Sequence, residues 1–402
     1  MKLNSAEKEW LDGSRGPGVQ LAMKMLVAVG EATGADRLIP VSSAHVVLDS
    51  FPLGEPGAVL LEELAAAGER FVVPTTTNSI SIDRNKPEDV DEVQTRILAA
   101  SSQLGALSTC SCNPFSQIIA PMFGESLAWS ESATAPYLNG VIGARTNREG
   151  GSAFASALTG LTPRYGMHLD SERRGGTVFE VDADLDDLSD FNVLGSIVAR
   201  RTEQGVPVLK LRSRPSVSHL FGFGASLAFL SSLPMYHLVG ITPEAPSMDA
   251  LFPDGTPSAI RISQKDIEDE HERFCTTQGN RVDIVSLGQP HATFDEVCEI
   301  DRLIAGRRVN GNIKFSISTN QSVFGLVRAA GVLRSLEAAG VEVTVDRMCF
   351  GCDLGPIKYS SDVVVATNSV KLANSAPGTR KVSIRLGSTK ECVEAAIAGQ
   401  WA

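Results

Sequence analysis

The sequence predicts an α/β fold with mostly parallel sheets, and two observations lead to this fold class. Amphipathic, helix-like segments alternate with short apolar runs that end in polar turns, the order expected when helices cover a parallel sheet. A chain of 402 residues with 43% apolar side chains is also long enough to bury one large core or two to three lobes. The composition therefore indicates a folded enzyme rather than a disordered chain.

In the N-terminal half, three helices are each followed by a buried strand that ends in a polar loop. Gly34 is expected to end the first helix, because glycine is the residue that most often follows a helix C-terminus. The expected helix and strand pairs are residues 19–33 with 38–47, 56–70 with 71–79, and 88–106 with 107–115.

A Gly- and Ser-rich passage at residues 140–166 and a charged stretch at 173–190 separate the two halves. We therefore expect a first lobe over residues 1–205 and a second over residues 206–402. Further strands are expected in the second half, at residues 206–212, 236–246, 281–291, 312–319, 341–352 and 362–371.

Charge and hydropathy exclude several function classes. A net charge of −11 argues against a sequence-independent phosphate-binding surface, so we expect no nucleic-acid partner. The N-terminus lacks the apolar core of a signal peptide, and no apolar stretch approaches 18 residues, which predicts a cytoplasmic protein without a membrane partner. Seven cysteines without a secretory signal favour metal ligands, reactive thiols or core residues over disulfides.

Two close cysteine pairs stand out, Cys110 with Cys112 and Cys349 with Cys352. Both follow apolar strand-like runs, and thiolates at such spacings can hold zinc or an iron–sulfur cluster. The alternative is that a member of either pair is a small core residue. The remaining three cysteines are single residues in helix-like segments, where a buried structural role is expected: Cys275, Cys298 and Cys392.

Histidines and arginines near strand ends are the other candidates for chemistry. His45, His168, His237 and His291 could each serve as a base or ligand, or as a satisfied structural residue. The glycine-flanked turn GARTNREGG, residues 143–151, could grip a carboxylate or phosphate through its arginines, or be a solvated loop. Nucleotide-binding glycine motifs and the HExxH zinc motif are absent from the sequence.

Several motifs in order resemble the catalytic subunit of the aconitase X family. They are PVSSAHV, TTTN, the CNPF turn, WSESATAPYLNGVIGARTNREGG, LTGLTPRYGMHLD, HLVGITPEA, LGQPH and TNSVKLANSAPG, which together span nearly the whole chain. The resemblance implies aconitase-type stacked α/β/α lobes, completed by a small swivelling domain. Because no such domain follows the last motif, the resemblance implies a separate small subunit that supplies a serine as catalytic base.

The resemblance also implies a set of site residues. Implied catalytic residues are Ser43, His45, Glu131, Ser132, Arg145 and Arg148. Implied substrate-binding residues are Ser42, Ser50, Asn78, Asn147 and Lys371. Implied metal ligands are Cys112 and either Cys349 or Cys352, with the other member of that pair or Cys110 as a possible substitute.

One position departs from the family pattern at the metal site. Gln289 stands where the family has a middle cluster cysteine, and a glutamine cannot supply a thiolate. The implied cofactor is therefore either an iron–sulfur cluster or a single iron.

The expected reaction is metal-assisted removal of water from a small hydroxy acid. Family activities are dehydration of cis-3-hydroxy-L-proline and of phosphomevalonate, and the Ser-, Thr- and Ala-rich composition favours hydroxyproline. A metal-binding relative that has lost catalysis is the non-enzymatic alternative, against which the intact GARTNREGG loop argues.

Overall fold

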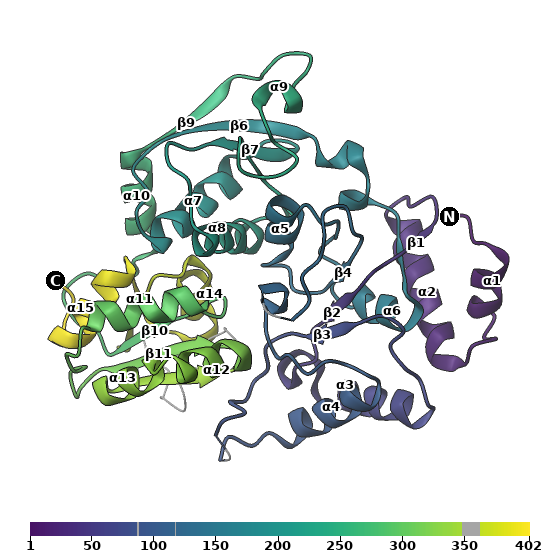
Figure 1. The fold of residues 1–402 in the computed structure, drawn as a ribbon, viewed down its shortest axis with the longest axis horizontal. Helices are drawn as coiled ribbons and strands as arrows, with labels where there is room; N and C mark the ends of the chain where they lie inside the picture. Colours follow the sequence, from purple (N-terminus) through teal and green to yellow (C-terminus); the bar gives the residue numbers. More distant parts are fainter. Residues whose placement is uncertain (87, 117, 348–361) are drawn as a thin grey trace.

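The computed structural model describes residues 1–86, 88–116, 118–347 and 362–402. Within these ranges, the sheets are parallel except for one two-stranded antiparallel pair, β1 with β5. Figure 1 shows three consecutive α/β units around a common centre, with the two termini at opposite ends. The expected α/β fold with mostly parallel sheets is confirmed.

The first unit contains a three-stranded parallel sheet of order β3-β2-β4. Helices α3, α4 and α6 contribute Leu61, Ile97 and Ala153 to the core that covers these short, fully buried strands. The unit consists of α1 (Ser5–Leu11), α2 (Pro17–Ala32), β1 (Leu38–Pro40), β2 (Ala44–Val46), α3 (Ser50–Ala66), β3 (Thr75–Thr77), α4 (Glu92–Gln103), η1 (Pro114–Ser116), β4 (Ala128–Trp129), α5 (Ala135–Tyr137), η2 (Leu138–Ile142), α6 (Ser152–Thr159), β5 (Leu161–Pro163), η3 (Gly166–His168) and η4 (Asp170–Arg173).

The second unit contains a four-stranded parallel sheet of order β8-β7-β6-β9. Phe179, Phe191 and Phe223 fill the core between this sheet and helices α7 and α8. The unit consists of β6 (Gly175–Asp182), α7 (Leu188–Arg201), β7 (Val206–Lys210), α8 (Val217–Leu230), β8 (His237–Leu238), α9 (Met248–Leu251), β9 (Ala259–Ser263) and α10 (Gln264–Phe274). The expected lobe boundary, between residues 205 and 206, falls just before β7, which pairs with β6; the two-lobe division stays a prediction.

The third unit contains a five-stranded parallel sheet of order β12-β11-β10-β13-β14. The chain leaves the central strand β10 toward β11 and β12, and β13 returns on its other side, so the carboxyl ends of β10 and β13 border a crevice. The unit consists of β10 (Ile284–Leu287), α11 (Phe294–Ile304), β11 (Lys314–Thr319), α12 (Gln321–Ala329), α13 (Val332–Ala339), β12 (Val341–Val345), β13 (Val364–Thr367), α14 (Val370–Arg380), β14 (Ser383–Leu386) and α15 (Thr389–Ala398).

The expectation of one strand over residues 38–47 is wrong. The segment forms two strands, β1 and β2, which belong to different sheets. Pro40 has no backbone N–H to continue a ladder. After it, the N–H groups of Val41 and Ser42 donate to the carbonyls of Gly160 and Ser126, which redirects the chain.

The strand expected over residues 107–115 is also absent from the described structure. Leu107 makes a single parallel bridge to Thr76, and the chain then leaves the sheet. Cys110 adopts a left-handed backbone conformation with φ of 44°, which a continuous strand does not tolerate. The segment is therefore a loop that carries two cysteines toward the third unit.

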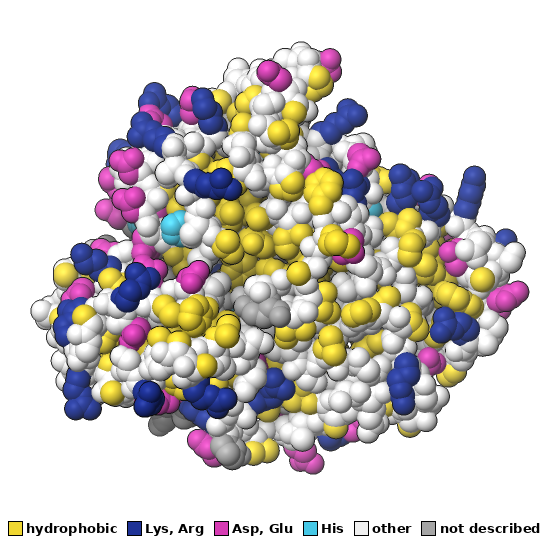
Figure 2. Space-filling view, in the orientation of Figure 1, with side chains coloured by type: hydrophobic (Ala, Val, Ile, Leu, Met, Phe, Trp, Pro, Cys, Tyr) yellow, Lys and Arg dark blue, Asp and Glu magenta, His cyan; other side chains and the backbone are white. Residues whose placement is uncertain are grey.

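Hydrophobic and charged side chains are distributed unevenly over the surface of the protein. Figure 2 shows hydrophobic side chains gathered in the middle of the viewed face, with most charged side chains nearer its edge. None of the described helices is both long and apolar enough to cross a membrane.

Candidate active site

Polar residues of the candidate site lie on and around the strands of the first sheet. Ser43 precedes β2, His45 is its middle residue, Asn78 follows β3, and Glu131 follows β4 after one intervening residue. Because parallel strands end at the same edge of a sheet, Asn78 and Glu131 lie close together, whereas Ser43 lies at the amino end of β2. The sheet therefore gathers groups that are far apart in the sequence.

His45 is held from both sides by its neighbours in the sheet. In the strand register it stands opposite Thr76 of β3 and Trp129 of β4. Thr76 Oγ1 lies 2.8 Å from His45 Nδ1, and the Trp129 ring stacks on the imidazole with ring centroids 4.3 Å apart. Burial lowers the pKa of His45 to about 4, although the Glu131 charge and Asn78 oppose this shift. The imidazole is therefore neutral at neutral pH.

Glu131 is a buried carboxylate that remains ionised. Asn78 Nδ2 donates to Glu131 Oε2 over 2.7 Å, and the Ala133 backbone N–H donates to Oε1 over 3.0 Å. Lys371 Nζ, from the first turn of α14, lies 3.6 Å from Oε1. Burial acts to raise the pKa of Glu131, but Lys371, these hydrogen bonds and His45 together bring it below its ordinary value. The ion pair also links the first unit to the third.

Three buried polar atoms of the predicted site residues have no hydrogen-bond partner in the described part of the protein. They are His45 Nε2 and Asn78 Oδ1, whose residues interact with Glu131, and Ser43 Oγ at the amino end of β2. Buried polar atoms are nearly always hydrogen-bonded in folded proteins, and exceptions mark positions for a ligand or ordered water. These atoms and the Glu131–Lys371 pair together indicate the position of a small polar ligand.

Arg148 adds a second cation to this region. Its Nη1 donates to the Ser231 carbonyl over 2.6 Å, which anchors the side chain to the second unit. Burial lowers the pKa of Arg148, and the charge of the Glu131 carboxylate opposes this shift. A guanidinium has five N–H donors, so Arg148 can hold this anchor and bind a carboxylate as well.

Arg145 and Asn147 bind the 165–170 segment instead. Arg145 Nη1 donates to the His168 carbonyl over 3.3 Å, and its Nη2 forms an ion pair with Asp170. Asn147 Oδ1 accepts from the backbone N–H of Met167 over 2.9 Å. In the described structure, these two side chains thus fix the turn beside the site.

The three remaining predicted serines have varied surroundings. Ser50 Oγ donates to Asp91 Oδ2 over 2.7 Å at the start of α3. Ser42 is exposed, and its Oγ lies 3.4 Å from the Ser126 carbonyl. Ser132 is half-buried next to Glu131. Their implied roles stay predictions.

Cys112 lies where three chain segments meet. Its Sγ accepts a hydrogen bond from the His291 backbone N–H over 3.3 Å, and the residue is 1% exposed. His291 Nε2 lies 2.9 Å from the carbonyl of Arg347, the last described residue before the segment that carries Cys349 and Cys352. These two cysteines lie outside the described residues. A backbone N–H that donates to sulfur suits a thiolate, so the surroundings of Cys112 fit its predicted role as a metal ligand.

Cys110 has a different environment. Its Sγ accepts a hydrogen bond from Thr77 Oγ1 over 3.8 Å, and burial raises the pKa of its thiol to about 12. A protonated, hydrogen-bonded thiol is a poorer ligand than a thiolate. Within the described ranges, no three His, Cys, Asp or Glu side chains group closely enough to hold a metal, so a complete ligand set would need the 348–361 segment.

Three residues that support His45 were not predicted from the sequence. Thr76 and Trp129 contact its ring directly, and Trp129 Nε1 donates to Thr134 Oγ1 over 2.7 Å. The TTTN and WSESAT strings contain them, but their role depends on strand register. The sequence motif was thus a signal for the region and not for the contacts.

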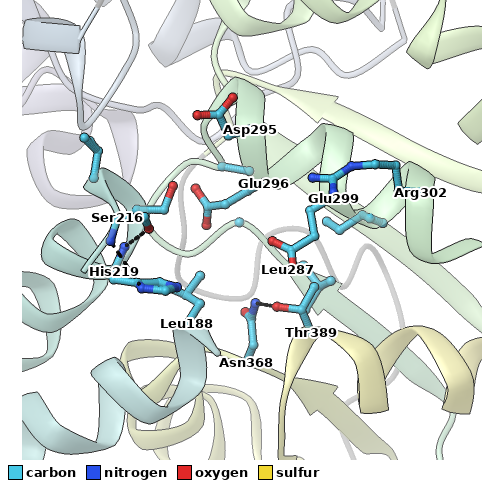
Figure 3. A pocket seen from close by; sticks show the side chains of 15 residues that line it. Leu188, Ser216, His219, Leu287, Asp295, Glu296, Glu299, Arg302, Asn368 and Thr389 are labelled. Carbon is cyan, nitrogen blue, oxygen red and sulfur yellow. Dashed lines mark hydrogen bonds between the residues drawn. The ribbon is translucent and has the colours of Figure 1, made fainter. Parts of the chain in front are cut away.

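A separate cavity of about 360 Å³ lies between the second and third units. Figure 3 shows His219 on one side and Glu296 and Glu299 of α11 on the other, with Asn368 hydrogen-bonded to Thr389 below them. None of the predicted site residues lines this cavity. Its empty volume therefore does not coincide with the polar cluster around Glu131.

Buried acid–base groups at the edge of a parallel sheet, next to an interior thiol, define an α/β enzyme. Consecutive parts of the chain match the three family models "Aconitase X first domain" over residues 1–171, "Aconitase X second domain" over 175–272 and "Aconitase X third domain" over 282–398.

Similar proteins extend this match over nearly the full chain. A phosphomevalonate dehydratase large subunit from Methanothermobacter thermautotrophicus is 34% identical, and the alignment covers 94% of each chain. A cis-3-hydroxy-L-proline dehydratase from Pseudomonas aeruginosa is 31% identical over 99% of this chain and 70% of that protein. The crystal structure of holo-form aconitase X from Thermococcus kodakaraensis superposes with a TM-score of 0.88 at 32% identity, covering 98% of this chain and all of that one. The chain belongs to the aconitase X family and is a dehydratase, that is, a hydro-lyase.

Proposed function

We propose that this dehydratase converts cis-3-hydroxy-L-proline to 1-pyrroline-2-carboxylate. The observation that carries this proposal is the charge pattern of the candidate site. One mostly buried, ionised carboxylate, Glu131, lies 3.6 Å from the ammonium group of Lys371, and its charge also acts on Arg148. A buried set of mixed charges suits a ligand that carries both signs.

Hydroxyproline is such a ligand, since it has a carboxylate and a ring ammonium on neighbouring atoms. Lys371 and Arg148 would bind its carboxylate, and Glu131 would bind its ammonium. As the proton leaves the carbon next to the carboxylate, negative charge moves onto the carboxylate oxygens. The same two cations would then stabilise the charge that develops in the transition state.

The reaction is a β-elimination. A base takes the C2 proton, the electrons of the C2–H bond form the C2–C3 double bond, and the C3–O bond breaks with its electrons leaving on oxygen. The departing hydroxide takes up a proton, so the net change is the loss of one water molecule. The resulting enamine tautomerises to the cyclic imine of 1-pyrroline-2-carboxylate. In the cis isomer the C2 hydrogen and the hydroxyl lie on opposite ring faces, so base and leaving-group assistance act from opposite sides.

Cys112, together with Cys349 and Cys352, would hold the iron–sulfur cluster or single iron, which supplies Lewis acidity at the leaving hydroxyl. The described protein contributes to this site by placing Cys112 against the His291 backbone. Gln289 offers no thiolate, and its carbonyl accepts from Ser369 Oγ over 2.5 Å. Because Ser369 caps the helix that carries Lys371, the turn that lacks the family cysteine still supports the substrate side of the site.

A small subunit is part of this proposal. Several relatives are named large subunits, including those from Methanothermobacter thermautotrophicus and Thermococcus kodakarensis. The small subunit would provide the swivelling domain and the serine that removes the C2 proton. This chain alone should therefore turn over little or no substrate. The expected cytoplasmic location stays a prediction.

Phosphomevalonate is the second candidate substrate. It is favoured by the alignment with phosphomevalonate dehydratase large subunits, which are matched over 94% of their own length. Its phosphate and carboxylate would, however, bring several negative charges toward Glu131. It also has no ammonium group to pair with that carboxylate.

The experiment that tests the proposal is an anaerobic assay of this chain co-expressed with a candidate small subunit. Loss of each substrate is followed, and iron and sulfide are quantified on the same sample. Turnover of cis-3-hydroxy-L-proline with bound iron supports the proposal. Turnover of phosphomevalonate alone, with competitive inhibition by inorganic phosphate, would replace it with the second candidate.

A further inference from the structure

His291 is a buried histidine whose side chain the proposed function does not use. It lies in the turn between β10 and α11 and is 0% exposed. Its Nε2 lies 2.9 Å from the carbonyl oxygen of Arg347. A carbonyl oxygen can only accept a hydrogen bond, so Nε2 must carry the hydrogen that joins them. In the neutral imidazole, the other ring nitrogen, Nδ1, then has a free lone pair.

That free nitrogen has no hydrogen-bond partner in the described part of the protein. His291 Nδ1 is completely buried, and no donor reaches it. Buried polar side-chain atoms are nearly always hydrogen-bonded, and the exceptions mark positions for an ion, a ligand or ordered water. A second proton on Nδ1 would create a buried charge without a partner at that atom, which costs more free energy than a lone pair does. The arrangement therefore favours a nitrogen that is ready to bind a cation.

The same residue contacts Cys112, the predicted metal ligand. The backbone N–H of His291 donates to Cys112 Sγ over 3.3 Å, and Asn113 Nδ2 donates to the His291 carbonyl over 3.2 Å. These two bonds hold the cysteine loop of the first unit against His291 of the third. Histidines that bind metals almost always donate their other ring N–H to a carbonyl, a carboxylate or water. The bond from His291 Nε2 to Arg347 is of this kind.

A comparison with His237 shows which of these features carries the argument. His237 Nε2 lies 2.7 Å from the Arg173 carbonyl, and its Nδ1 is also buried without a hydrogen-bond partner. Its ring therefore has the same two features as that of His291. Among the described residues, however, no hydrogen bond joins His237 to a cysteine. The contact with Cys112 is what distinguishes His291.

We propose that His291 Nδ1 is a metal ligand beside Cys112 Sγ, so that the iron of this dehydratase is bound by nitrogen as well as sulfur. Imidazole nitrogen suits iron, and histidine takes the place of cysteine in some iron–sulfur centres. Gln289, two residues earlier in the same turn, has no thiolate to offer, and its carbonyl accepts from Ser369. This inference rests on the proposed function, because it takes iron to bind at Cys112, and deepens it by naming a second ligand.

A histidine nitrogen bonded to iron has a direct spectroscopic signature. This chain, co-expressed with its small subunit, is labelled with nitrogen-15 in the histidine rings only, so that the backbone nitrogen of His291 beside Cys112 does not contribute. The anaerobic complex, with its own iron in a paramagnetic state, should show the strong nitrogen-15 hyperfine coupling of a directly bonded nitrogen in pulsed electron paramagnetic resonance. A wild-type complex that contains iron but lacks this coupling would overturn the inference.

His291→Gln separates a ligand role from a structural one. Its amide nitrogen can still donate to the Arg347 carbonyl, but the variant has no ring nitrogen to bind iron. We expect the coupling to vanish and the retention of iron against a chelator to fall by about tenfold or more. His291→Asn is a second variant, in case the first does not fold, and should lose the coupling as well. Coupling that persists in a folded variant contradicts the assignment.

His237→Gln is the matched control, because it makes the same change in a ring with the same carbonyl contact. It should keep both the coupling and the iron; loss of the coupling in this variant would assign the nitrogen ligand to His237. Turnover measured on the same samples separates the two proposals. Coupling without turnover of cis-3-hydroxy-L-proline supports the ligand and removes the substrate, whereas turnover with iron but no coupling does the reverse. A folded complex that binds no iron overturns both the ligand and the metal site.

Discussion

Two half-buried glutamates, Glu131 and Glu296, show how differently this protein uses the same side chain. Glu131 and Glu296 each accept a hydrogen bond from a backbone N–H group. Lys371 and Asn78 hold the pKa of Glu131 below its ordinary value despite burial. Burial raises the pKa of Glu296 to about 6, the Glu299 charge adds to this shift, and no cation opposes it among its causes. The difference lies in the partner and not in the depth of burial.

The two glutamates also border different kinds of space. Glu296 caps helix α11 at the rim of the open cavity in Figure 3, whereas Glu131 lies among unpartnered polar atoms. Empty volume therefore identifies a gap between two units. Charge pairing and unsatisfied hydrogen bonds identify the site where chemistry is expected.

Replacing one cysteine of the predicted metal site and one cysteine beside the cavity should give the largest contrast in iron content and activity. Cys112→Ala should abolish bound iron and dehydratase activity together, because it removes the proposed ligand. Cys298→Ala, on the helix beside the cavity, should retain both. Iron analysis and turnover of the co-expressed complex measure the effect. A Cys112→Ala complex with full iron and activity would remove this residue from the metal site.

The glutamates themselves provide the next test. Glu131→Gln should lower kcat/KM by about a thousandfold, since it removes a charge that binds the substrate in the transition state. Glu296→Gln should leave kcat/KM unchanged, because glutamine also serves in a capping box. Steady-state kinetics at neutral pH compare the two. Equal losses in both variants would mean that the effects arise from folding and not from the site.

His45, in the first sheet, should make the free energy of unfolding depend on pH. The folded pKa of His45 is about 4 and its ordinary value is 6.5, so the unfolded chain takes up a proton first as the pH falls. The His45 contribution to the free energy of unfolding should therefore be full above pH 6.5 and decline by about 3 kcal/mol as the pH falls to 4. Denaturant unfolding of wild type and His45→Gln measures it. A difference between them that is constant with pH would refute the prediction.

Arginines of the candidate site and of the cavity should also differ in their effect on kcat/KM. Arg148→Ala should lower kcat/KM by about a hundredfold through loss of transition-state stabilisation. Arg302→Ala, at the rim of the cavity, should have no effect on kcat/KM. If Arg148→Ala keeps the wild-type value, the GARTNREGG loop is a structural turn and the carboxylate is bound elsewhere.

Glu296 should give the smallest effect, with the sign opposite to that of His45. Its folded pKa of about 6 exceeds the ordinary 4.5, so the folded protein holds the proton more tightly. Stability should be full below pH 4.5 and decline as the pH rises to 6, by at most about 2 kcal/mol. Glu296→Gln should lose this dependence in the same unfolding assay. If the wild-type protein instead gains stability relative to Glu296→Gln as the pH rises from 4.5 to 6, the raised pKa of Glu296 is contradicted.

The fold class could be read from the sequence because its local signals agree with the structure. Helix α2 ends at Ala32, and Gly34 follows with a φ of 72°, as its position predicted. The two errors, at residues 38–47 and 107–115, are places where a single residue ends or prevents a strand that the apolar pattern predicted to be continuous. In the first, Pro40 interrupts the ladder; in the second, Cys110 turns left-handed.

The candidate site could be predicted in part. The family motifs contain His45, Asn78, Glu131 and Lys371, and the structure brings these four side chains into one cluster. The same motifs contain Arg145, whose side chain binds His168 and Asp170 instead. A motif shows which residues a family keeps, but it does not show which partner each side chain takes.

By itself, the sequence determined the alternation of helices and strands, the family, and the polar residues that follow each strand, because these depend on nearest neighbours along the chain. Only the tertiary structure decided that Lys371 of the third unit meets Glu131 of the first, and that Thr76 and Trp129 flank His45. Such contacts depend on strand register and on the packing of separate units. Those are properties of the whole chain, and no local pattern encodes them.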